Sequence, residues 1–128
     1  MHQTEQAVEF AMMVVCLLTG MSHLLRPDIW TRFFSMLADK GSSGPIVHGF
    51  ISLPAGILVI TLHQVWRGPG LVLTIWGVLL VAKAVSGFLF PELALRSLNL
   101  ARNNDLGFRA AGIAMLGVAA ACALALYG

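Results

Sequence analysis

The chain has 128 residues, of which 58% are hydrophobic and only 11% are charged, and its formal net charge is +2. A soluble domain of this length needs more charged residues than this to cover its surface. The mean hydropathy of +0.83 favours lipid as the surrounding medium. The small net charge gives no indication of a nucleic-acid partner. Composition therefore excludes an ordinary soluble domain and predicts an integral membrane protein.

Four segments are apolar over about the 20 residues that a transmembrane helix needs. They are predicted at about 7–25, 45–65, 70–90 and 107–127. The first contains one acid, Glu9, and the third contains one base, Lys83. The N-terminus carries Glu5 rather than the basic residues of a signal peptide, so the first segment is expected to remain as a span. The sequence predicts one all-α membrane domain of four helices over residues 1–128.

The basic residues predict how these spans are oriented. Six of them follow the first or third span, namely Arg26, Arg32, Lys40, Arg96, Arg102 and Arg109. Arg67 alone lies between the second and third spans. Connections rich in Lys and Arg stay in the cytoplasm. Both long connections are therefore predicted to be cytoplasmic, and both termini are predicted to face out of the cell's interior.

The two halves of the chain look like copies of one hairpin. Residues 20–37 align without gaps to residues 84–101, which places Pro27 opposite Pro91 and Arg32 opposite Arg96. A short match follows, with Gly-Phe at 49–50 and again at 107–108. The repeats are predicted at about 7–66 and 69–128. Because each contains two spans, both would insert with the same topology.

The connections after the first and third spans each begin with a proline. Large apolar side chains then recur on one helical face in the first of them, at Trp30, Phe33, Phe34 and Leu37. This pattern predicts an amphipathic helix lying at the membrane interface. Pro91 begins a weaker copy, with Leu95, Leu98 and Leu100 as anchors. Asp105 is predicted to cap the fourth span.

Small residues recur along the third and fourth spans and predict where helices approach closely. They include Gly77 and Ala84 on the third span, and Ala110, Ala114, Gly117 and Ala121 on the fourth. Such strips are typical of a homo-oligomer or of a subunit of a larger membrane complex. The two cysteines, Cys16 and Cys122, lie in apolar runs and are expected to be free, buried thiols.

Two stretches, "TGMSHLLRPDIW" and "KAVSGFLFP", resemble the YjeT-type family of small bacterial inner-membrane proteins. Members of that family are two-span hairpins of unknown function. The matching positions are Pro27-Asp28-Ile29-Trp30 with Arg32 in the first half, and Pro91, Arg109 and Gly112 in the second. The resemblance covers most of both halves and implies two such hairpins fused in one chain.

The chain departs from that family at one position. The family carries a glutamate eight residues before the proline, but this position holds Thr19 in the first half and Lys83 in the second. No role of that acid can be transferred to this chain. The resemblance therefore implies an inner-membrane protein and little about its activity.

Lys83 is the residue that fits a lipid environment least, because a lysine at mid-membrane depth is disfavoured by about 2.5–3.5 kcal/mol. In one interpretation its side chain reaches the headgroups. In the other it faces the bundle interior, beside polar residues that the topology places at similar depth, namely His23, His48, Ser22 and Ser86. Possible counter-ions are Asp28 and Glu92. Toward the opposite membrane face, Glu9 and His63 are expected to be hydrated.

Three classes of function are compatible with these residues. The first is a non-enzymatic interaction or accessory protein, and the second is a small-solute or ion transporter assembled as a dimer. The third is a redox subunit that binds haem or a quinone, with His23 and His48 as weak candidate ligands. No spacing motif supports a metal or cofactor, and none is predicted. No nucleophile with an oriented base or phosphate-binding loop occurs, so enzymatic activity is not expected.

Overall fold

The computed structural model describes residues 2–102 and 104–128, with side chains from Gln3 onward. This part of the chain folds into six α-helices and contains no β-strand. The helices are α1 (His2–Leu25), α2 (Pro27–Asp39), α3 (Ser43–Leu62), α4 (Gly70–Leu89), α5 (Pro91–Leu100) and α6 (Asp105–Tyr127). Four of them, α1, α3, α4 and α6, are long and apolar enough to cross a membrane. The prediction of an all-α protein with four candidate spans is confirmed.

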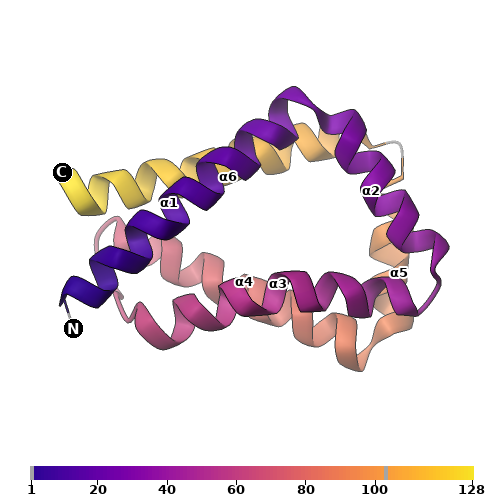
Figure 1. Ribbon diagram of the computed structural model, residues 1–128, viewed down its shortest axis with the longest axis horizontal. Helices are drawn as coiled ribbons and strands as arrows, with labels where there is room; N and C mark the ends of the chain where they lie inside the picture. Colours follow the sequence, from indigo (N-terminus) through magenta and orange to yellow (C-terminus); the bar gives the residue numbers. More distant parts are fainter. Residues whose placement is uncertain (1, 103) are drawn as a thin grey trace.

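The four long helices pack as two pairs, α1 with α6 and α3 with α4. Figure 1 shows that the pairs converge near the two termini and separate toward the opposite end of the molecule. The short helices α2 and α5 cross between the separated ends of the pairs (Figure 1). The result is a wedge, with space between the pairs at the end that α2 and α5 close.

Glycines bring each pair of helices into close contact. On α1 and α6, a Cβ atom added at Gly20 would lie 2.9 Å from the carbonyl oxygen of Gly112. The reciprocal Cβ at Gly112 would lie 2.7 Å from the carbonyl oxygen of Gly20. On α3 and α4, Gly77 leaves no room for a Cβ beside Val59. Such approaches increase van der Waals contact where lipid provides no hydrophobic driving force between helices.

Both short helices start at a proline, which fixes the backbone φ angle for a first helical turn and lacks an N–H that would be left unpaired there. Leu37 and Ala38 of α2 pack against Leu98 of α5 in a small core of their own. Just beyond these helices, Arg102 forms an ion pair of 2.6 Å with Asp39. The two connections thus support each other rather than lying apart.

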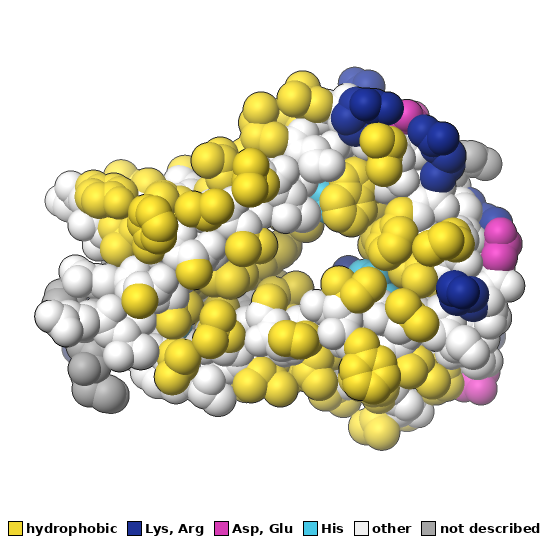
Figure 2. All heavy atoms as spheres, viewed as in Figure 1, with side chains coloured by type: hydrophobic (Ala, Val, Ile, Leu, Met, Phe, Trp, Pro, Cys, Tyr) yellow, Lys and Arg dark blue, Asp and Glu magenta, His cyan; other side chains and the backbone are white. Residues whose placement is uncertain are grey.

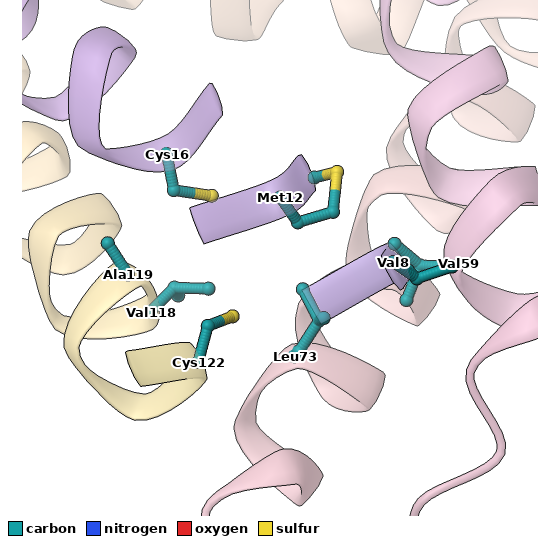
Figure 3. Close-up of a cluster of buried hydrophobic side chains, with 8 residues drawn as sticks. All are labelled: Val8, Met12, Cys16, Val59, Leu73, Val118, Ala119 and Cys122. Atoms are coloured by element: carbon teal, nitrogen blue, oxygen red, sulfur yellow. The ribbon is translucent and has the colours of Figure 1, made fainter. Parts of the chain in front are cut away.

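A second, larger core joins α1, α3, α4 and α6 near the narrow end of the wedge (Figure 3). Its buried members are Val8, Met12, Cys16, Val59, Leu73, Val118, Ala119 and Cys122. The expectation of free, buried cysteines is confirmed, because both thiols belong to this core and neither forms a disulfide. This core closes the space between the helix pairs on the side of the termini.

Two details of the helices differ from the sequence prediction. The residue that caps α6 is Asn104, whose side-chain oxygen accepts a hydrogen bond of 3.1 Å from the backbone N–H of Gly107, and Asp105 is the first helical residue. The apolar stripe of α2 turns toward the other helices, with Leu37 fully buried and Trp30, Phe33 and Phe34 half-buried. The outer face of α2 carries Ile29 and Met36 instead.

Within one chain, the predicted packing residues of α4 and one of the four on α6 are buried, whereas the other three on α6 are not. Gly77 and Ala84 are buried against α3. Ala121 of α6 is buried among the helices of the bundle. In contrast, Ala110, Ala114 and Gly117 are exposed, and a Cβ added at Gly117 would meet nothing within 4 Å. The α6 face that meets α1 carries Gly112 instead. Packing of the exposed strip against another copy stays a prediction.

Candidate binding cavity between the helix pairs

A cavity of about 210 Å³ lies between the two helix pairs, next to α2. Its walls come from five helices, and the charged or polar side chains among them include His23, His48 and Lys83. The apolar part of the wall includes Met12, Trp76, Leu80 and Met115. Figure 2 shows the molecule hollowed at this place, with histidine and basic side-chain atoms visible inside the opening. The wedge arrangement therefore brings three basic side chains, those of His23, His48 and Lys83, to one largely apolar cavity.

Lys83 faces this cavity rather than the surrounding lipid. It lies six residues before the end of α4, which corresponds to about 9 Å along the helix axis. Its Nζ atom lies 5.8 Å from the centre of the Phe34 ring, within the range of a cation–π interaction. The side chain is accessible in the isolated chain, but the space it reaches is lined by other residues of the protein. This arrangement corresponds to the second of the two interpretations of Lys83.

Aromatic rings from several helices form the wall nearest to α2. The imidazole of His23 stacks on the indole of Trp30 at 4.0 Å between centroids. Phe34 makes edge-to-face contacts with both His48 and Phe108, at 5.2 Å and 5.0 Å. These contacts hold α2 against α1, α3 and α6. The aromatic stripe predicted as a membrane anchor thus encloses the cavity.

A second cavity, also about 210 Å³, adjoins the first and shares Phe34, His48 and Lys83 with it. It lies toward α5 and adds the hydroxyl groups of Ser86 and Ser97. Lys83 therefore stands between a largely apolar cavity and a more polar one.

The predicted polar site is only partly assembled. Lys83, His48 and Ser86 line the second cavity, and His23 joins the first two of them in the other cavity. Ser22 lines neither cavity. Its hydroxyl oxygen accepts a hydrogen bond of 2.8 Å from the indole N–H of Trp30. Its contribution is to fix the Trp30 ring.

The predicted counter-ions do not pair with Lys83. Asp28 forms exposed ion pairs with Arg26 at 3.4 Å and Arg32 at 3.1 Å. The hydrogen bond from Arg26 is the main reason why the pKa of the Asp28 carboxyl lies below its ordinary value. Glu92 is exposed in the first turn of α5. Within residues 2–102 and 104–128, the ion pairs of the structure leave the Lys83 ammonium without a carboxylate.

A separate polar cluster lies at the opposite end of the long helices. The imidazole Nε2 of His63 lies 2.9 Å from a carboxylate oxygen of Glu9, and its Nδ1 lies 3.0 Å from the hydroxyl of Thr74. Glu9 is 5% exposed, Thr74 is 1% exposed and His63 is not exposed at all. The expectation that Glu9 and His63 are hydrated is wrong, because each satisfies the other inside the protein.

The hydrogen bonds of this cluster define its proton content. The Thr74 hydroxyl donates its only proton to a carbonyl, at 2.6 Å from the oxygen of Val65. The Nδ1–H of His63 must then donate to Thr74, which leaves Nε2 and the Glu9 carboxyl to share one proton between them. With that proton on either the His63 nitrogen or the Glu9 oxygen, the net charge of the Glu9–His63 pair is zero. A neutral pair accounts for the burial of two ionisable residues in an apolar helix bundle.

The two polar sites are well separated. Glu9 and His23 lie on the same face of α1 and are 14 residues apart, which corresponds to about 21 Å along the axis. Met12 and Cys16, between them, belong to the larger apolar core. Lys83 and His23 therefore lie far from the Glu9–His63 pair, although the apolar end of the cavity reaches Met12, one helical turn from Glu9.

Neither site has the ligand set of a typical metal centre. In the described part of the chain, no three His, Cys, Asp or Glu residues are grouped so that they could hold a metal ion. The His23 Nδ1–H donates to the carbonyl oxygen of Thr19 at 2.8 Å, which fixes the ring and leaves Nε2 as its acceptor. His48 contacts Phe34 through its ring.

Sequence reasoning missed several residues of both sites. Trp76 and Met115 of the cavity wall look like ordinary apolar span residues, and no spacing distinguishes them. The position of Thr74 on the third span indicates only a small residue suited to helix packing, although a threonine that follows a His-containing connection is a potential partner for that histidine. Compared with protein-family models, curated proteins and solved structures, the chain matches none.

Proposed function

We propose that the chain is a non-enzymatic four-span protein of a bacterial inner membrane that binds a small amphiphilic molecule in the cavity between its helix pairs. The observation that carries this proposal is the joint position of Lys83, His23 and His48 in an otherwise apolar cavity. Small-molecule sites typically combine apolar walls with a few convergent polar groups. Ionisable residues inside a membrane bundle mark functional sites more often than structural ones.

The charge distribution supports an orientation with both termini in the periplasm. Figure 2 shows the charged side chains gathered over the end of the molecule formed by α2 and α5. The six basic residues of the α2 and α5 connections and the start of α6 are exposed, as is Arg67 at the other end. The excess of basic groups favours a cytoplasmic position for α2 and α5. Those helices would then lie near the inner membrane surface, with the cavity just above them.

The order and pairing of the helices support a duplicated hairpin of the YjeT type. Each half consists of a long, a short and a long helix, and the short helix starts at a proline in both. Exchanging the two halves converts the pair α1–α6 into the pair α4–α3, so a two-fold relation preserves the packing. We propose that the two copies interleave, each placing its two spans in different pairs.

The helix contacts favour another alignment between the second spans of the two halves, namely one that differs from the Gly-Phe match at 49–50 and 107–108. Gly49 lies against Ala84, and Gly112 lies against Gly20, which is aligned with Ala84. Gly49 therefore corresponds to Gly112 rather than to Gly107. The offset of 63 residues agrees closely with the offset of 64 between the two prolines, 27 and 91.

Filling the cavity tests the binding function. Ala55 is half-buried in the cavity wall, whereas Ala82 is exposed and lines neither cavity. Protein purified in a gentle detergent is expected to carry a bound small molecule that native mass spectrometry detects. An Ala55→Phe variant should lose it and an Ala82→Phe variant should keep it. The absence of any bound molecule in the unaltered protein, or equal occupancy in both variants, would contradict the proposal.

Self-association remains a second candidate function. The observation in its favour is the exposed strip of Ala110, Ala114 and Gly117 on α6, which leaves one helix face free for close approach by another copy. A Gly117→Ile variant should then shift an oligomer to monomer in detergent without lowering the helical content. If the unaltered protein is monomeric at the same concentration in nanodiscs, the strip contacts only lipid.

The size of the cavities bears on the redox alternative. Each is about 210 Å³, below the range of about 300–1,000 Å³ typical of cofactor and drug-sized sites. Haem would therefore require the helix pairs to separate further. The head group of a small amphiphilic molecule fits without such a separation of the helix pairs.

A further inference from the structure

We infer that the ligand of this cavity is an acidic amphiphile whose anionic group pairs with the ammonium of Lys83 and whose apolar part extends between the helix pairs. The inference rests on the proposed binding function and adds the chemical class of the ligand. The anionic group is a carboxylate or phosphate, carried either by a free single-chain acid or by the head group of a membrane lipid.

Lys83 has no anionic partner among the described residues. Its Nζ atom lies over the face of Phe34, and no carboxylate of the described residues forms an ion pair with it. Three of the six acids form ion pairs elsewhere, Asp28 and Asp39 with arginines and Glu9 with His63. The other three are Glu5, in the first turn of α1, and the exposed Glu92 and Asp105, and none of them lines either cavity. An ammonium removed from bulk water is stabilised by an anion close to it. A ligand is the remaining source of that anion.

The polar groups around Lys83 can donate hydrogen bonds to an anion. His48 lies beside it in both cavities, and Ser86 and Ser97 line the cavity toward α5. Hydroxyl and imidazole N–H groups donate hydrogen bonds to oxyanions. An anionic group at Lys83 would therefore find several donors and no competing carboxylate in the cavity walls.

The end of the cavity away from Lys83 is apolar. From Lys83 toward the apolar core, the cavity is lined by Leu80, Trp76 and Met12 on two different helices. Two methionines, Met12 and Met115, are unbranched and adapt to an irregular apolar chain. Because polar groups are at one end and apolar groups at the other, the cavity matches an amphiphile rather than a nucleotide or a sugar. A cationic ligand is disfavoured by Lys83 itself, which already occupies one aromatic face.

The inference is tested by equilibrium binding to the full-length protein in nanodiscs of neutral phosphatidylcholine. The probes are decanoate, its uncharged analogue decan-1-ol, and phosphatidic acid as the two-chain lipid alternative. Lys83→Met should weaken binding of the anionic probe by about tenfold or more, because one partner of a buried charge pair is lost. Lys83→Arg retains the charge and should bind within a few-fold of the unaltered protein. Lys40→Met removes the only other lysine, which is exposed, and should change nothing.

The arms of the experiment have distinct outcomes. Saturable binding of decanoate that depends on Lys83 identifies a free acid as the ligand class, and the same dependence for phosphatidic acid alone identifies a lipid head group. If decan-1-ol binds as tightly as decanoate and Lys83→Met affects neither, the inference is wrong while the binding function stands. If no probe binds and Ala55→Phe has no effect on any bound molecule, both are wrong.

Discussion

At the scale of single residues, the polar side chains of the long helices divide into two groups with different partners. Glu9 and His63 satisfy each other, together with Thr74, within packed protein. Lys83, His23 and His48 instead face a cavity. The seven-residue spacing of Glu9, Cys16 and His23 places them on one face of α1, and in the structure all three are buried. It cannot predict their partners, because His63 is 54 residues away from Glu9.

The Glu9–His63 pair is expected to contribute strongly to stability. His63→Ala leaves a buried carboxyl without its partner and should destabilise the protein by about 3–5 kcal/mol. Glu9→Gln keeps a hydrogen-bonding oxygen and should have a smaller effect. Thermal unfolding in detergent, followed by circular dichroism, measures both. Glu92→Gln is the control, because Glu92 is exposed. If His63→Ala unfolds at the same temperature as this control, the buried pair does not form.

At the scale of helices, the sequence predicts which segments are helical but not which face of α6 is buried. That helix contains alanine or glycine at almost every turn on every side, so small size alone does not distinguish a contact face from a lipid face. The feature that distinguishes the contact face of α6 lies in α1, where Gly20 has no side chain and the backbone of Gly112 can approach it closely. The short helices show a similar limit. The stripe that begins at Trp30 is equally suited to lipid or to a protein interior, and the splayed helix pairs determine that it faces inward.

The crossing of α1 and α6 provides a matched test on one helix. Gly112→Val places methyl groups against the backbone of Gly20 and should destabilise the protein by about 1–3 kcal/mol or more. Gly117→Val points into open space and should stay within about 0.5 kcal/mol of the unaltered protein, apart from any effect on oligomers. The comparison is made by chemical or thermal unfolding in the same detergent. A larger loss at Gly117 than at Gly112 would show that the α1–α6 packing is wrong.

At the scale of the whole molecule, the number of spans and their approximate ends follow from hydrophobic length alone. The four candidate spans of the structure begin and end within about four residues of the predicted ones. The pairing of α1 with α6 and α3 with α4 does not follow from the sequence, because every long helix is apolar on most of its surface. Once the pairs are known, the cavity follows from their divergence and from the aromatic rings of α2 that enclose it.

The proposed orientation is tested with reporter fusions. Alkaline phosphatase fused after Gly128 should be active, because it would reach the periplasm, and a fusion at Gly41 between α2 and α3 should be inactive. Green fluorescent protein at the same two positions should give the opposite pattern. An inactive phosphatase at the C-terminus together with an active one at Gly41 would invert the topology and place the cavity near the periplasmic surface.

The position of Lys83 in a cavity inside the bundle underlies the proposed binding function. It is tested most directly by the accessibility of a cysteine at that position. Lys83→Cys is compared with Val85→Cys, which lies on the exposed side of α4, in a chain whose own thiols are removed by Cys16→Ser and Cys122→Ser. In membranes, a small water-soluble thiosulfonate should label position 83, and decanoate should slow that labelling. Position 85 should react only with a lipid-soluble maleimide. Labelling of position 83 by the lipid-soluble reagent alone would contradict the cavity and the binding function built on it.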